Sequence, residues 1–320
     1  MLTPAFLHYL SVAIAIGLSG IGSGIGQGIA GFGALSALSR QRIGGDSIFR
    51  ALVLGLALIE SGLILSLVVA LILLFGGMPK EITLGIGLAE LGMGIAVGCT
   101  AAAVGIASSF AVKSACISIS RQPHHCQKII TLMLLIQSII EAPVIFGLLI
   151  ALLIKTQITD ALTLCEGIKL CASGIAIALG SIGPSIGQAI FAKESCSAAG
   201  LNTESFSNLL PFSLLSQAVI ETPIIFSLVI SAILIFKPIA IATATTIAIV
   251  SLVVAFTVGF GTGGSAIASG YVASKSAKYI ALKKEHYPVF LQSTLLSQAI
   301  IESSAIYALI VGLVLVTRVL

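Results

Sequence analysis

The chain has 320 residues, of which 58% are hydrophobic and only 9% are charged. This composition excludes a disordered chain and an ordinary soluble domain, and it indicates an integral membrane protein. The formal net charge of +4 is small and the basic residues are scattered. We therefore expect no nucleic-acid partner.

Long apolar runs recur along the chain. A membrane-spanning helix needs about 20 apolar residues, and the sequence has eight such runs, two in each repeated unit. We predict an all-α integral membrane protein of four tandem transmembrane helical hairpins, with boundaries at 1–78, 79–158, 159–237 and 238–320. Residues 1–38 have no basic n-region and no clear cleavage site, so we expect them to be retained as the first transmembrane helix.

The predicted helices follow one another in pairs. The first pair covers residues 8–39 and 47–75. The second covers 81–119 and a helix that continues through Glu141 to residue 154. The third covers 161–198 and 204–236, and the fourth covers 239–281 and 287–319. Short polar turns separate the two helices of each pair.

One acidic residue interrupts the second apolar run of every hairpin. The four are Glu60, Glu141, Glu221 and Glu302, spaced by 81, 80 and 81 residues. A charge at the centre of a bilayer costs roughly 2.5–3.5 kcal/mol on insertion scales, so such residues mark function. We interpret the rest of the chain as a scaffold for these four carboxylates.

The first helix of the first hairpin is rich in glycine. Gly20, Gly24 and Gly28 form one helical stripe, and a second stripe with Gly22 and Gly26 lies about 200° away. Small residues four apart let helices approach closely in lipid, so two opposite stripes favour a neighbour on each side and a closed ring over a generic tight bundle. No Lys-Ser/Thr follows, which argues against a phosphate-binding loop.

Polar residues accompany the glutamates at fixed spacing. Thirty-three residues before them stand Gln27, Ser108, Gln188 and Ser269, and directly after them stand Ser61, Ala142, Thr222 and Ser303. A carboxylate in lipid carries a cation reversibly only if polar groups share its charge. One turn before three of the glutamates stand Gln137, Gln217 and Gln298, which either hydrogen-bond to the site or bridge helices.

Lysine and arginine predict the orientation in the membrane. Eleven lie at or near the turns within hairpins: Arg40, Arg42, Arg50, Lys113, Arg121, Lys128, Lys193, Lys275, Lys278, Lys283 and Lys284. Five lie toward the other side: Lys80, Lys155, Lys169, Lys237 and Arg318. The turns should therefore face the cytoplasm, with both termini outside.

Cysteine and histidine give no metal-site pattern. The six cysteines form no CxxC pair, so we expect free thiols. His124-His125-Cys126 has no acidic residue or further Cys or His nearby in the sequence, which argues against a metal site there.

Together, the Gly-rich first helix, the turn Arg121-Gln122-Pro123 and the mid-helix acid resemble the ion-carrying c subunit, or proteolipid, of rotary ATP synthases. Arg40-Gln41 holds the same place before Glu60. The segments around Gln27 and Glu302 are similar to F-type members. The resemblance covers the whole chain, four times over.

The resemblance implies a rotor subunit that forms part of a c-ring with copies of itself, in a bacterial inner membrane and in contact with lipid. It implies a stator a subunit and central-stalk subunits as partners, the latter touching Arg40, Gln41, Arg121, Gln122 and Pro123. Such a subunit is not an enzyme and has no cofactor. Each glutamate would carry H⁺ or Na⁺ past the stator.

The resemblance also implies a sodium shell. Gln and Glu of one hairpin bind the ion, and the next hairpin adds a hydroxyl and the backbone carbonyl two residues before its own Glu. Gln27 with Glu60 and Gln188 with Glu221 match the first part, and Ser108 and Ser269 replace Gln in the other hairpins. Ser61, Thr222 and Ser303 match the hydroxyl, and Tyr307 matches an orienting Tyr. The carbonyls belong to Leu58, Ile139, Val219 and Ile300.

The repeats differ, and two alternatives stay open. Hairpin 2 has Ser108, Ala142 and Phe146, which is closer to a proton site, and hairpins 3 and 4 lack the turn Arg. A V-type ATPase proteolipid is the first alternative. The second is a secondary ion transporter built from repeats, which would need inverted repeats and broken helices at one central site.

Overall fold

The computed structural model describes residues 3–41, 43–76, 83–238 and 244–318. Arg42 and Lys80, two of the basic residues used for the orientation, lie outside these residues. Every regular element in the described ranges is helical. The predicted all-α fold class is confirmed, because eight helical segments are long and apolar enough to cross a membrane.

The helices pair into hairpins along the chain. The first hairpin is α1 (Pro4–Arg40) and α2 (Gly45–Phe75), and the second is α3 (Leu84–Arg121) followed by α4 (Cys126–Ile140) and α5 (Ala142–Gln157) in line. The third is α6 (Leu164–Leu201) and α7 (Phe206–Phe236), and the fourth is α8 (Ala244–Leu282) and α9 (Tyr287–Arg318). Single 3₁₀ turns at Pro123–His125, Thr203–Ser205 and Lys284–His286 connect the helices of the last three hairpins.

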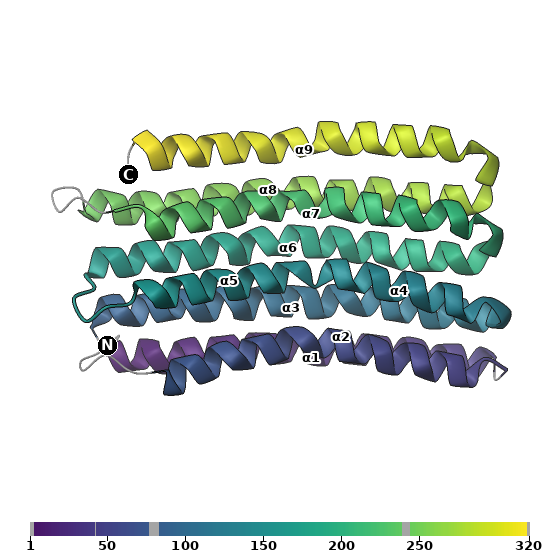
Figure 1. Cartoon of the computed structure of the whole chain (residues 1–320), viewed down its shortest axis with the longest axis horizontal. Coiled ribbons are helices and arrows are strands. Elements are labelled where there is room, and N and C mark those ends of the chain that lie inside the picture. Colours follow the sequence, from purple (N-terminus) through teal and green to yellow (C-terminus); the bar gives the residue numbers. More distant parts are fainter. Residues whose placement is uncertain (1–2, 42, 77–82, 239–243, 319–320) are drawn as a thin grey trace.

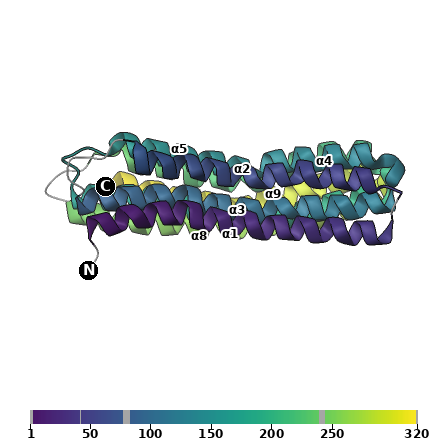
Figure 2. The same cartoon turned by 90° about the horizontal axis from the view of Figure 1, so that it is seen from below.

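These helices form two layers. In the inner layer α1, α3, α6 and α8 pack side by side in chain order, and α2, α4–α5, α7 and α9 cover them (Figures 1 and 2). Each outer helix packs on its own inner helix and on its neighbours. Figure 1 shows α1 and α8 at opposite ends of the row, so the row has two open edges.

Glycine sets the spacing of the inner helices. A Cβ added to Gly22 would collide with the backbone of Ala102, and one added to Gly105 would lie 3.2 Å from the carbonyl carbon of Gly22. The same contact recurs between Gly183 of α6 and Gly263 of α8. In lipid, such backbone contact gives the dispersion energy that holds helices together.

Only one of the two predicted glycine stripes has a partner within the chain. Gly22 and Gly26 face α3, whereas a Cβ on Gly20, Gly24 or Gly28 would meet no atom within 4 Å. The second stripe lies on the open edge of α1. The stripe of Gly20, Gly24 and Gly28 therefore has no neighbouring helix among the described residues of the chain.

The second hairpin departs from the prediction at its glutamate. The sequence predicts a continuous helix through Glu141, but the helix breaks there into α4 and α5. Pro143 has no N–H to donate, and the Val144 N–H instead bonds to the Glu141 carbonyl at 3.1 Å. In α7, Pro223 stands at the equivalent place without ending the helix.

Candidate ion-binding site

The four glutamates lie at one level of the bundle. Glu60 is the midpoint of α2 and Glu221 the midpoint of α7, Glu302 is central in α9, and Glu141 joins α4 to α5. Because the outer helices run side by side in the same direction (Figure 1), a glutamate near the middle of each one lies about midway between the hairpin turns and the opposite end.

The best-formed site surrounds Glu141 and joins two hairpins. The Ser61 hydroxyl of α2 donates a 2.7 Å hydrogen bond to Oε2 of Glu141. The Gln137 amide nitrogen donates to the Ser108 hydroxyl at 2.8 Å and approaches the Gly55 carbonyl at 3.3 Å. Ser108 lies beside the Glu141 carboxyl group. Side chains from α2, α3 and α4 thus meet at one half-buried acid.

This geometry shows which neighbouring hairpin supplies the hydroxyl at Glu141. The hydroxyl at Glu141 comes from the preceding hairpin along the chain, so Ala142 does not deprive Glu141 of a donor. The repeat spacing predicts the same register for the next two hairpins, with Ala142 opposite Glu221 and Thr222 opposite Glu302. The Thr222 side chain does lie beside the Glu302 carboxyl group, while its hydroxyl donates to the Ala218 carbonyl at 3.2 Å. Among the three glutamates that have a preceding hairpin in the same chain, Glu221 is therefore the one that this register leaves without a hydroxyl.

The predicted glutamine companions differ in their contacts. The Gln27 amide donates to the Ser23 hydroxyl at 3.4 Å. Gln188 is fully buried, and neither of its amide atoms has a hydrogen-bond partner among the described residues. Ser269 is buried at the corresponding position of α8. The sequence leaves the role of Gln137 open, and the structure brings it into the Glu141 site.

The Glu60 site is incomplete within one chain. Glu60 is exposed at the open edge and accepts no hydrogen bond from the described residues. Ser303, the third hydroxyl of the series, lies on α9 near the other edge and donates to the Ile300 carbonyl of the same helix at 2.7 Å. Tyr307 is exposed on the same helix. Within the described chain, side chains of a neighbouring hairpin therefore reach Glu141 and Glu302, and none is recorded at Glu60.

The predicted stalk-contacting residues gather at the turn end of the bundle. Arg40 and Arg121 are exposed in the last turns of α1 and α3. The backbone N–H groups of Gln41 and Gln122 close these helices, and Pro123 begins the next turn. Across the described ranges no three His, Cys, Asp or Glu side chains cluster as a metal centre, the segment at His124 included.

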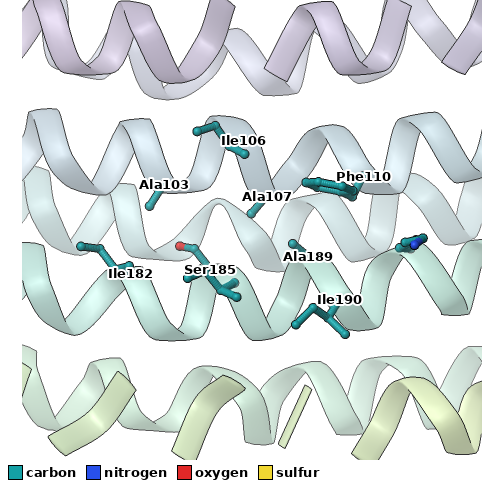
Figure 3. Close-up of a pocket in the computed structure, with 10 residues that line it drawn as sticks. Ala103, Ile106, Ala107, Phe110, Ile182, Ser185, Ala189 and Ile190 are labelled. Carbon is teal, nitrogen blue, oxygen red and sulfur yellow. The ribbon is translucent and has the colours of Figure 1, made fainter. Parts of the chain in front are cut away.

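One apolar cavity is distinct from all four glutamates. It has a volume of 420 Å³ and lies between α3 and α6 (Figure 3). Ile106 and Phe110 line it from α3, Ile182 and Ile186 line it from α6, and Lys193 stands at its edge. The lining is almost wholly apolar, so this cavity is not an ion site.

Comparison with known proteins agrees with this architecture. The family model that describes the C subunit of ATP synthase matches residues 10–73, 91–154, 171–234 and 252–315. The chain belongs to the ATP synthase C subunit family. It is therefore an integral multi-pass membrane protein, a rotor proteolipid of four fused family units, and it is not an enzyme.

Individual relatives match one unit at a time. The ATP synthase c subunit of Dehalococcoides mccartyi is 46% identical over 69 residues, which are 22% of this chain and 91% of the relative. The c subunit of Microcystis aeruginosa is 44% identical over 73 residues, which are 23% of this chain and 90% of the relative. That of Geotalea uraniireducens is 43% identical over 75 residues, 23% of this chain and 82% of the relative.

Proposed function

We propose that this chain carries H⁺ or Na⁺ across a membrane by reversible binding at Glu60, Glu141, Glu221 and Glu302. The observation that supports this most directly is the 2.7 Å hydrogen bond from Ser61 to Glu141, which holds a mid-membrane carboxyl group between two hairpins. A charge there is expensive unless it is paired or hydrogen-bonded, and a bound ion neutralises it. The occupied site can then pass through lipid.

The ring is completed by further copies of the chain. Gly22 of α1 and Gly105 of α3 lie at the contact between these two helices. In the repeats, Gly264 of α8 is the equivalent of Gly22, and Gly24 of α1 is the equivalent of Gly105. These two equivalents lie on the two open edges, where a Cβ would meet no atom within 4 Å. Apposing these edges would bring Ser303 of one copy to Glu60 of the next, as Ser61 meets Glu141. The sites at Glu60 would thus form between copies. The four family units, at 1–78, 79–158, 159–237 and 238–320, would repeat around the ring.

A stator a subunit releases the ion, and central-stalk subunits receive the rotation at Arg40, Gln41, Arg121, Gln122 and Pro123. The hairpin turns face the cytoplasm of a bacterial inner membrane, following the excess of Lys and Arg there. The membrane potential is worth about 2.3 kcal/mol per charge per 100 mV, which sets the direction. Parallel rather than inverted repeats favour this function over a secondary transporter, and the names of the relatives favour ATP synthase over a V-type pump.

The test replaces all four glutamates by Gln in the complete ATP synthase. We expect ATP-driven ion uptake into vesicles to be lost, because Gln cannot release a proton or balance a cation. Glu285→Gln, in the exposed turn before α9, is the matched control and should leave uptake unchanged. Coupled uptake by the fourfold variant would refute the function.

A further inference from the structure

Three of the four hairpins carry a glutamine four residues before the acid. These are Gln137, Gln217 and Gln298, all fully buried, and the first hairpin has Leu56 there. Residues four apart lie on one face of a helix, so each amide is on the same side as its glutamate. The chain therefore contains three sites with this amide and one without it.

The Gln137 amide is oriented by its contacts. The Gly55 carbonyl can only accept, so the amide must present its NH₂ group there, and the same nitrogen reaches Ser108. The side-chain oxygen is thereby the free end, and it has no partner among the described residues. Oε1 of Glu141 is also buried without a partner in the described chain. Two buried oxygens without donors thus belong to one site.

The other two glutamines, Gln217 and Gln298, have more unpaired polar atoms than Gln137. Both amide atoms of Gln217 and of Gln298 are buried without a partner in the described chain, as are both of Gln188. Leaving a buried polar group unpaired costs about 1–3 kcal/mol, so native structures normally satisfy such groups with a bound polar species. Glutamine and carboxylate oxygens together suit a hard cation.

We propose that the side-chain oxygens of Gln137, Gln217 and Gln298 are ligands for the cation carried at the following glutamate, with Na⁺ as the cation. The inference rests on the proposed function. Of the four sites that each chain contributes, three would then have an added amide ligand, and the site at Glu60 would have Leu56 in its place. At Glu60 the cation is held without this oxygen, so Na⁺ binds there more weakly than it would with an amide at position 56.

The test measures protection of each glutamate by Na⁺ in the assembled ring. A carbodiimide that modifies protonated buried carboxyl groups is applied over a series of NaCl concentrations, with choline chloride keeping ionic strength constant. Mass spectrometry then gives the half-protecting Na⁺ concentration at each glutamate. Because Glu221 lacks a hydroxyl, the contribution of the amide is measured by variants at a single glutamate and not by ranking the four glutamates.

The variants exploit the natural difference between the repeats. Gln217→Met keeps the length of the side chain without the amide, and it should raise the half-protecting concentration at Glu221 about tenfold or more, the effect of losing one interaction with a charged group. Protection at Glu60 should stay unchanged. Leu56→Gln is the reciprocal variant and should lower the concentration needed at Glu60.

Each outcome bears on the inference separately from the function. An unchanged half-protecting concentration at Glu221 in an intact Gln217→Met ring would overturn the inference. So would labelling of the unchanged ring that depends on pH alone, although the glutamates would then still act as proton carriers. Absence of labelling at all four glutamates would refute the proposed function itself.

Discussion

Glu141 and Glu60 occupy equivalent positions in neighbouring repeats, yet their surroundings differ. Glu141 lies in a seam between two hairpins, where Ser61 donates to it and Ser108 and Gln137 lie alongside. Glu60 is exposed on the open edge and has no such donor among the described residues of its own chain. The difference teaches that an ion site is formed where two neighbouring hairpins pack together, a contact that we call a seam, and not within a single hairpin. A fused chain of four hairpins contains three seams.

The same comparison holds for the inner layer. On one side of α1, glycine backbones touch α3, and on the other side the matching glycines face no atom within 4 Å. Both open features, the glycine stripe and the unpartnered glutamate, belong to the same edge. A second copy would complete both at once, and the predictions below test this edge against the seams inside the chain.

The largest effect is expected from variants that block the open edge, so that a second copy cannot pack against it. Gly24→Leu or Gly264→Leu should abolish the large ring, because a leucine side chain would fill the space that a neighbouring backbone needs. Neither residue has an atom within 4 Å of a Cβ position in the chain, so the fold of one chain should be preserved. Native mass spectrometry measures assembly and circular dichroism measures helix content.

The control for these variants adds the same side chain where no neighbour is expected. Ala299 is exposed, and so are its equivalents Ala57, Ser138 and Ala218, two of which lie in interior hairpins. Ala299→Leu should therefore assemble normally. An intact ring from Gly264→Leu would show that the copies do not meet through this register.

The next largest effect compares the hydroxyl at a seam inside the chain with the hydroxyl at the open edge. Ser61→Ala should raise the Na⁺ concentration that protects Glu141 from carbodiimide by about tenfold or more, since a hydrogen bond to a charged group contributes about 1.5–3 kcal/mol. Ser303→Ala should do the same at Glu60, but only in assembled rings. If Ser303→Ala instead affects Glu302, the site is formed within one hairpin.

A smaller change should improve the site at Glu221. Ala142→Ser places a hydroxyl where Ser61 stands in the first hairpin, so it should lower the half-protecting Na⁺ concentration at Glu221 severalfold. Protection at Glu141 should not change, because Glu141 already receives Ser61. A change confined to Glu141 would contradict the assignment of hydroxyls across the seams.

The smallest effect concerns the break in the second hairpin. Pro143 cannot donate to the carbonyl of Ile139, which is approached by the Glu141 backbone N–H at the end of α4, and that carbonyl belongs to the predicted shell of Glu221 in the structural register. Pro143→Ala restores an N–H donor, engages the carbonyl, and should weaken Na⁺ protection at Glu221 about twofold to threefold, a fraction of the effect of a full hydrogen bond. Ring assembly should persist, since Pro223 already sits inside an unbroken α7.

Sequence alone determined the class of this protein. Eight apolar runs, four mid-helix acids on one period and the repeated small residues predict four membrane hairpins, because the bilayer fixes helix length and penalises every unpaired charge. The tertiary structure decided which side chains share a site. The family resemblance implies that a neighbouring hairpin supplies the hydroxyl, and the structure shows that Glu141 receives it from the preceding hairpin through Ser61, because the direction of packing is not encoded in a single hairpin. The unpartnered edge of α1 arises in the same way, from how the hairpins pack, whereas the break at Glu141 coincides with Pro143 of that hairpin.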